Sequence, residues 1–149
     1  MSYHLLKLIH ILSATLMIGT GLGSAFYLFF SYLTGRVSTV KDVLVLVIKA
    51  DYLFTAPSVA IQIITGIILS KKLGLLYTNW FWTVLFLSFL VFILWLRAVF
   101  IQNKLKRILM EENRIGKEFD SLMRYWVLLG IPSFTLAIYI YYLMVYKSL

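Results

Sequence analysis

Long apolar segments separated by short polar ones dominate the pattern of this chain. A helix needs about 20 mostly apolar residues to cross a bilayer, and four segments reach that length. The expected helices cover residues 3–33, 39–72, 80–115 and 121–146. The pattern therefore predicts an all-α membrane protein, with one domain built as a four-transmembrane-helix bundle.

Residues that start or stop helices set these boundaries. Gly35 follows the first helix, where a glycine can take the left-handed conformation that ends a helix. The third helix is expected to continue into water as a polar segment as far as Gly116, and Pro132 is expected to kink the fourth. Side-chain caps for the last three helices are expected from Ser38 or Thr39, from Thr78 and Asn79, and from Asp120 and Ser121.

Composition agrees with a membrane location. Of the 149 residues, 62% are hydrophobic, and the mean hydropathy is +0.92. A water-soluble domain of this size exposes too much surface to tolerate that composition. The absence of cysteine excludes disulfides, thiolate metal ligands and cysteine nucleophiles. The first apolar segment is too long for the core of a signal peptide, so we expect a retained helix.

The net charge of +8 is distributed unevenly across the predicted membrane. The side of the first and third loops carries Arg36, Lys41, Lys104, Lys106, Arg107, Arg114, Lys117 and Arg124, whereas the other side carries Lys7, Lys71, Lys72 and Lys147. By the positive-inside rule, those two loops are cytoplasmic and both termini face outward. We expect the basic residues to contact anionic lipids on the cytoplasmic side rather than nucleic acid.

His10 is the polar residue in the first helix that most needs an explanation. An unpaired imidazole in hydrocarbon costs free energy, so a partner is expected. His10 is either a structural histidine bonded to a neighbouring helix or an axial ligand of haem iron. Met17 and Gly21 share its helical face, where the glycine leaves room for a flat ligand. Lys7, one turn earlier, could meet a carboxylate such as a haem propionate.

The outer half of the fourth helix lies at the depth of His10 in this topology. Tyr141 and Met144 are therefore candidate partners or second axial ligands, although packing and an aromatic girdle would also explain them. With one histidine at this depth, the iron would be five-coordinate, His/Met or His/Tyr, unless two chains supply two histidines. We predict that the first helix packs against the fourth with the His10 face inward.

Three other intramembrane features call for packing partners. Asp51 and Arg97 lie near the cytoplasmic boundary and are predicted to form an ion pair, because an isolated charge there is costly. Gln62 needs a partner on another helix. Gly19 and Gly23, on the side of the first helix away from His10, have the Gly-x-x-x-Gly spacing that favours close helix packing. Paired catalytic carboxylates, catalytic triads, phosphate-binding loops and multi-histidine metal motifs are absent from the sequence.

Four blocks of the sequence resemble successive blocks of a bacterial family of predicted four-helix integral membrane proteins of unknown function. They are "LLKLIHILSATLMIGTGLGSAF", "KADYLFTAPSVAIQIITG", "LWLRAVFIQNKLKRI" and "RYWVLLGIPSFTLAIYIYYLMVYK". The resemblance implies a multi-pass protein of the bacterial inner (cytoplasmic) membrane. That family is in turn distantly similar to the HemJ-type protoporphyrinogen IX oxidases and the CopD-like membrane domains, which are associated with haem b.

Individual residues carry the HemJ-like part of the resemblance. His10, after Leu-Lys-Leu-Ile, matches the first-helix histidine that serves that family as a haem ligand. Pro57 with Gly66 resembles the second-helix pattern. The last helix resembles that of the HemJ-type family at Arg124, Pro132 and Lys147. HemJ-type proteins also carry a lysine close after a tryptophan on the third helix, whereas "NWFWTVLFLS" is uncharged, and their later third-helix histidine is missing. HemJ-like oxidoreductase activity is therefore left open.

Two functions from different classes remain. The first is binding of haem b or a porphyrin at His10, with a role in electron transfer or porphyrin handling. The alternative is a non-enzymatic scaffold or accessory subunit of a larger membrane complex, or a homo-oligomer, joined through the face of Gly19 and Gly23. A small transporter or metal-handling protein is disfavoured because the sequence has neither an inverted repeat nor a ring of intramembrane ligands.

Overall fold

The computed structural model describes residues 2–146, and these residues form helices and connecting turns without any strand. The elements are α1 (Tyr3–Leu33), α2 (Val37–Ala50), the π-helical η1 (Asp51–Thr55), α3 (Ala56–Lys72), α4 (Asn79–Glu111) and α5 (Lys117–Tyr146). With α2, η1 and α3 taken as one stretch, four helices are long and apolar enough to cross a membrane. The predicted all-α, four-span architecture is confirmed. Lys147, part of the expected last-helix pattern, lies outside the described residues.

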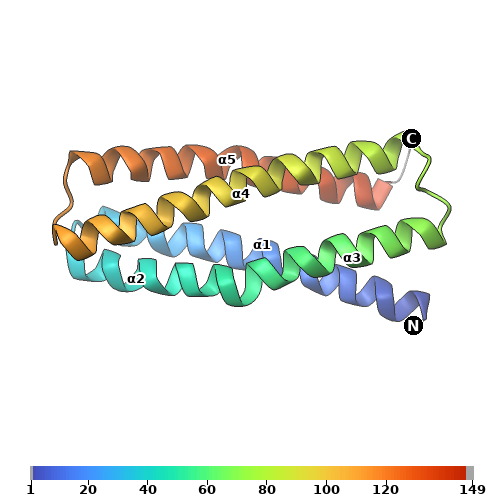
Figure 1. Cartoon of the computed structure of the whole chain (residues 1–149), viewed down its shortest axis with the longest axis horizontal. Coiled ribbons are helices and arrows are strands. Elements are labelled where there is room, and N and C mark those ends of the chain that lie inside the picture. Colours follow the sequence, from blue (N-terminus) through green and yellow to red (C-terminus); the bar gives the residue numbers. More distant parts are fainter. Residues whose placement is uncertain (1, 147–149) are drawn as a thin grey trace.

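The bundle consists of two helical hairpins (Figure 1). One pairs α1 with the continuous α2–η1–α3 stretch, and the other pairs α4 with α5. The start of α1, the α3–α4 connection and the end of α5 lie at one end of the bundle. The α1–α2 turn and the α4–α5 connection lie at the opposite end. Which end faces the cytoplasm stays a prediction from the distribution of basic residues.

The prediction that the first helix packs mainly against the last is wrong. Helix α1 packs most extensively on α3 and then on α2, and its contact with α5 is much smaller. The physical reason is the short turn after Thr34, because helices joined by a short connection become antiparallel neighbours. The His10 face of α1 therefore meets α3.

Several helix ends match the expected signals. Gly35 (φ +65°) and Gly74 (φ +68°) take the left-handed conformation just beyond α1 and α3. Thr78 caps α4, since its hydroxyl accepts a hydrogen bond from the backbone N–H of Phe81 at 3.3 Å. Helix α2, however, begins at Val37 after Arg36 without a side-chain cap, so the predicted caps at Ser38 and Thr39 are wrong.

The third expected helix ends earlier, and the fourth begins earlier, than predicted. Helix α4 stops at Glu111, because Asn113 takes a left-handed φ of +49°, which asparagine tolerates better than most residues. Helix α5 begins at Lys117 rather than at residue 121. Asp120 does not cap it. Instead, its carboxylate accepts a hydrogen bond from the Tyr32 hydroxyl at 2.7 Å and ties α5 to α1.

The second expected helix contains a π-turn just before Pro57. Proline lacks a backbone N–H, and its ring clashes with the carbonyl four residues earlier in an α-helix. The wider turn of η1 relieves this clash, and the N–H of Ala56 bonds to the carbonyl of Asp51, five residues back. The helix thus continues across Pro57 with Asp51 and Thr55 both buried in the π-turn.

Two apolar clusters hold the bundle. The larger one joins both hairpins at the end of the α1–α2 turn, and contains Leu28, Val40, Leu44, Val47, Ile48, Ile101, Leu105, Ile108, Leu109, Phe119, Met123 and Trp126. The smaller one, centred on Trp80, Val84 and Leu143, lies within the α4–α5 hairpin at the other end. There the indole N–H of Trp80 donates to the carbonyl of Leu143 at 2.8 Å. The hairpins are therefore joined mainly at one end.

Candidate functional site

A row of polar side chains runs between α1 and the η1–α3 stretch, and we call it the polar seam. Its members are spaced three, four or seven residues apart, so they share one face of each helix. They are His10, Ser13, Thr20 and Ser24 on α1, and Asp51, Thr55, Ser58, Gln62 and Thr65 on η1 and α3. Six of these side chains are buried, namely Ser13, Ser24, Asp51, Thr55, Ser58 and Thr65.

His10 is bonded to Thr65 across the seam. The distance from His10 Nδ1 to Thr65 Oγ1 is 2.7 Å. The Thr65 hydroxyl donates its one proton to the carbonyl of Ile61 at 2.6 Å, so it can only accept from the imidazole. His10 therefore carries its proton on Nδ1, and the lone pair of a neutral ring lies on Nε2. A hydrogen bond from the other ring nitrogen fixes the tautomer of metal-binding histidines in the same way.

Gln62 fixes the register of the two helices around His10. Its side-chain amide donates to the backbone carbonyl of His10 and, at 2.7 Å, to the hydroxyl of Ser13. The Ser13 hydroxyl in turn donates to the carbonyl of His10 at 3.0 Å. The expectation that Gln62 finds a partner on another helix is confirmed. Farther along the seam, α1 packs against η1.

Gly66 makes the close approach of the imidazole possible. A Cβ atom at this position would lie 3.4 Å from Cε1 of His10. A side chain there that pointed toward His10 would crowd the ring. The sequence comparison of Pro57 with Gly66 singled out this glycine, but its contact with His10 could only be found from the fold.

The other predicted site residues surround His10 unevenly. Met17 is partly buried and Gly21 is exposed, and a Cβ atom at Gly21 would meet no atom within 4 Å. Lys7 is exposed in the second turn of α1. Tyr141 is exposed and lies near Thr15, whereas Met144 packs against the Trp80 cluster. The described hydrogen bonds of His10 go to α3 and to its own helix, rather than to Tyr141 or Met144.

The predicted ion pair between Asp51 and Arg97 is wrong. Asp51 is buried, at 5% exposure, and its carboxylate accepts a long hydrogen bond of 3.4 Å from the indole N–H of Trp95. Arg97 is exposed. Two positions along a helix correspond to a rotation of about 200°, so the faces of Trp95 and Arg97 differ. Within residues 2–146 the ion pairs are Lys104–Glu118 at 2.9 Å and Arg114–Glu112 at 3.0 Å.

Sequence reasoning missed most of the seam. Thr55, Ser58 and Thr65 look ordinary in a membrane helix, since a hydroxyl there can bond to its own backbone. The usable signal was their spacing with Asp51 and Gln62, because residues 51, 55, 58, 62 and 65 follow one helical face. That spacing predicts a polar stripe but not its partner helix.

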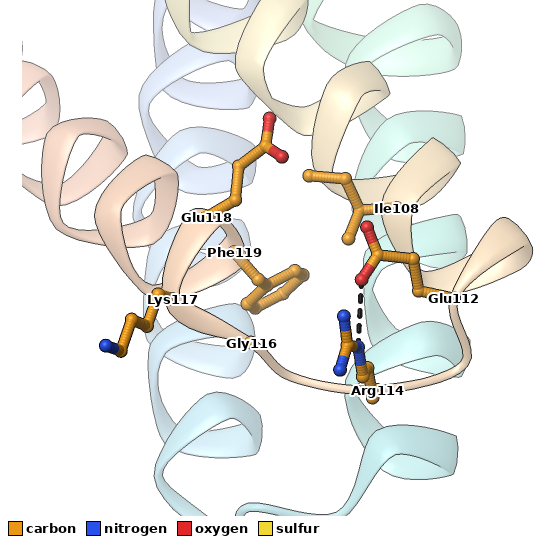
Figure 2. A pocket seen from close by; sticks show the side chains of 7 residues that line it. All are labelled: Ile108, Glu112, Arg114, Gly116, Lys117, Glu118 and Phe119. Atoms are coloured by element: carbon orange, nitrogen blue, oxygen red, sulfur yellow. Dashed lines mark hydrogen bonds and ion pairs between the residues drawn. The ribbon is translucent and has the colours of Figure 1, made fainter.

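Two hollows lie far from His10, towards the α4–α5 connection. Figure 2 shows the larger, of about 480 Å³, with Glu112 bonded to Arg114 and with Phe119 at its floor. The smaller is lined by Phe100, Asn103, Lys104 and Arg107. Charged groups of both signs surround the larger one, so it suits water-facing polar contacts better than a flat apolar ligand.

Clustered metal-ligand sets of the usual kind are not found in the described residues. Residues 2–146 contain no cluster of three or more His, Cys, Asp or Glu side chains that could hold a metal ion. A haem iron needs only an axial ligand from the protein, since the porphyrin supplies the other four nitrogens. The donor chemistry at His10 therefore fits a haem better than a bare metal ion.

Comparisons with known proteins agree with a membrane protein. A family model described as "Predicted integral membrane protein (DUF2269)" matches residues 4–148. Neither the curated proteins nor the solved structures contain a match. Because the family match extends over nearly the whole chain, and the fold consists of four helices long enough to span a bilayer, this protein belongs to the DUF2269 family of predicted integral membrane proteins.

Proposed function

We propose that this membrane protein binds haem b or a related porphyrin through Nε2 of His10, and acts in electron transfer or porphyrin handling. The observation that carries the proposal is the proton assignment at the imidazole. Thr65 accepts from Nδ1, which leaves the Nε2 lone pair free for a metal. Nε2 takes part in none of the described hydrogen bonds. It is also not among the described side-chain atoms that are fully buried without a hydrogen-bond partner.

The surroundings of the imidazole also suit a flat ligand. Gly21 lies on the His10 face of α1 with no atom within 4 Å of its Cβ position, and Met17 between them is partly buried. A bound haem would supply reversible one-electron chemistry at iron. The chain would hold the imidazole in one orientation through Thr65 and Gln62. Lys7 would offer a positive charge to a propionate, and Met144 or Tyr141 would be candidates for a second ligand.

The decisive experiment is haem reconstitution followed by a visible absorption spectrum. Wild-type protein in detergent should take up haem and show a Soret band. The His10→Ala variant should lack the band but keep its helical circular dichroism, because alanine is well tolerated in a helix. His4→Ala is the matched control, since His4 is exposed and its ring lies edge-to-face with Tyr3. Full haem binding by His10→Ala would reject the proposal.

We place the protein in the bacterial cytoplasmic membrane, with the α4–α5 connection on the cytoplasmic side. The basic side chains near this connection support that orientation, since Lys104, Arg107 and Arg114 are exposed there. They would also contact anionic lipid headgroups. The oxidase reaction of HemJ-type enzymes is not part of the proposal, because residues 79–88 of α4 carry no charged side chain.

A scaffold or accessory subunit is the second candidate, favoured by one observation. A Cβ atom at Gly19 or at Gly23 would meet nothing within 4 Å, so neither glycine is used for packing within the described chain. A Gly-x-x-x-Gly face left open in this way is suited to another transmembrane helix. If reconstitution yields no haem, native mass measurements of Gly23→Leu against the control Gly130→Leu should reveal loss of a larger assembly.

A further inference from the structure

Asp51 is a buried carboxylate that forms no ion pair within residues 2–146. It is 5% exposed, and its described hydrogen bond is the 3.4 Å contact from Trp95. Lys49, two residues before it, is exposed, and so is its predicted partner Arg97. Neither forms an ion pair with Asp51 within residues 2–146. A carboxylate taken out of water needs a compensating charge or must give up its own.

Thr55, one turn further along η1, also lacks a partner. Its side chain is 3% exposed, and its hydroxyl oxygen is buried without any hydrogen bond. Three other threonines show what a helix normally provides. The hydroxyls of Thr15, Thr65 and Thr135 donate to the carbonyls of Ile11, Ile61 and Ile131, each four residues back.

Thr55 differs from these threonines in lying inside the π-turn. There the N–H of Ala56 donates to the carbonyl of Asp51, four positions before Thr55, and the Thr55 hydroxyl does not donate to that carbonyl. The hydroxyl of Thr55 also makes no bond to the Asp51 carboxylate, although the two are one turn apart. A ligand that contacts both the Asp51 carboxylate and the Thr55 hydroxyl would satisfy both groups.

We propose that Asp51 and Thr55 bind one alkali-metal cation, such as Na⁺, between η1 and α1. Such cations prefer hard oxygen donors, and α1, which packs against η1, carries the buried hydroxyl of Ser24. A monovalent ion neutralises the single carboxylate, whereas a divalent ion would leave a net positive charge in the membrane. A water molecule could fill the same gap but would leave the carboxylate charge uncompensated.

The test measures thermal unfolding of haem-free, detergent-solubilised protein in Na⁺, K⁺, Li⁺ or choline chloride at one ionic strength. A ligand that binds only the folded state raises Tm, so one alkali cation should raise it by several degrees over choline, saturably. Asp51→Asn and Thr55→Val should lose this rise. Asp42→Asn, an exposed acid on α2, and Thr15→Val, whose hydroxyl bonds its own helix, should retain it.

Equilibrium dialysis with radioactive Na⁺ gives the direct measurement, with about one ion bound per wild-type chain and none in the two seam variants. If Asp51→Asn fails to fold, Thr55→Val still decides the matter. Equal stability in choline and in every alkali chloride would overturn the proposal. So would an infrared carbonyl band of a protonated carboxylic acid that persists in Na⁺ and disappears in Asp51→Asn, because a proton then balances the charge.

Discussion

His10 Nδ1 donates to Thr65 Oγ1 over 2.7 Å, and this one bond both fixes the imidazole tautomer and ties α1 to α3. Thr65 can accept because its own proton goes to Ile61. A structural histidine and a haem-binding histidine would share this bond. The two roles differ in whether Nε2 binds a ligand from outside the chain. Substitutions that change the surroundings of His10 are therefore the most informative tests.

Thr65→Val tests the bond itself. Valine leaves the Nδ1 proton of His10 without an acceptor, which should cost about 1–3 kcal/mol of unfolding free energy. If haem binds at Nε2, its affinity should also fall by about 10–100-fold, as for other outer-shell partners. Haem titration and chemical denaturation measure the two effects. Thr135→Val, whose hydroxyl only bonds its own helix at an exposed position, should change neither.

Gly66→Leu tests the space beside the ring. The leucine Cβ would lie 3.4 Å from His10 Cε1, and the rest of the side chain would crowd the imidazole and its bond to Thr65. We expect a lower Tm, and a weaker Soret band on reconstitution, for Gly66→Leu than for Gly66→Ala. Gly130→Leu is the control, since a Cβ there meets nothing within 4 Å. Equal behaviour of the two leucine variants would contradict the contact.

Met144→Leu and Tyr141→Phe test the second axial position. In a His/Met site, replacing Met144 should convert the iron to a high-spin form, visible as a shifted Soret band. In a His/Tyr site, Tyr141→Phe should do so instead. A five-coordinate site, or one with a histidine from each of two chains, should scarcely change in either variant, and cross-linking would then identify the pair of chains.

Trp95→Phe and Arg97→Gln separate the two partners considered for Asp51. The indole N–H of Trp95 bonds the carboxylate, and its loss should destabilise the protein by about 1–3 kcal/mol. Arg97 is exposed, and its replacement should change stability by less than about 0.5 kcal/mol. Denaturation of both variants in the same detergent provides the measurement. A larger loss for Arg97→Gln would restore the ion pair.

Single-cysteine labelling tests the orientation in the membrane. The chain has no cysteine, so Tyr77→Cys and Asn113→Cys each introduce one thiol, at opposite ends of the bundle. Tyr77 is 96% exposed in the α3–α4 connection. A membrane-impermeant maleimide should label Tyr77→Cys on intact spheroplasts, and Asn113→Cys only after lysis. The reverse pattern would show that the basic loops face outward.

The sequence predicts the spans well because bilayer thickness and hydropathy determine them almost locally. The bounds of α1 and the cap at Thr78 follow from neighbouring residues alone. The partner of His10 does not, because helix pairing depends on turn length and on matching stripes far apart in sequence. The π-turn also escaped prediction, since Pro57 indicates a distortion without saying which preceding residues absorb it. Trp95 was overlooked because opposite charges at Asp51 and Arg97 suggested a simpler pair.

The one-ended core has a consequence for motion. The large apolar cluster clamps the two hairpins together beside the α1–α2 turn, whereas α3 packs extensively only on α1 and η1. We therefore expect the large cluster, where Leu44 and Leu105 are packed, to act as a pivot, and the hairpin ends beside His10 to separate more readily. Amide hydrogen exchange should be slowest around the pivot and faster toward the His10 end. A ligand or a lipid chain would then enter sideways from the bilayer, without passing through water.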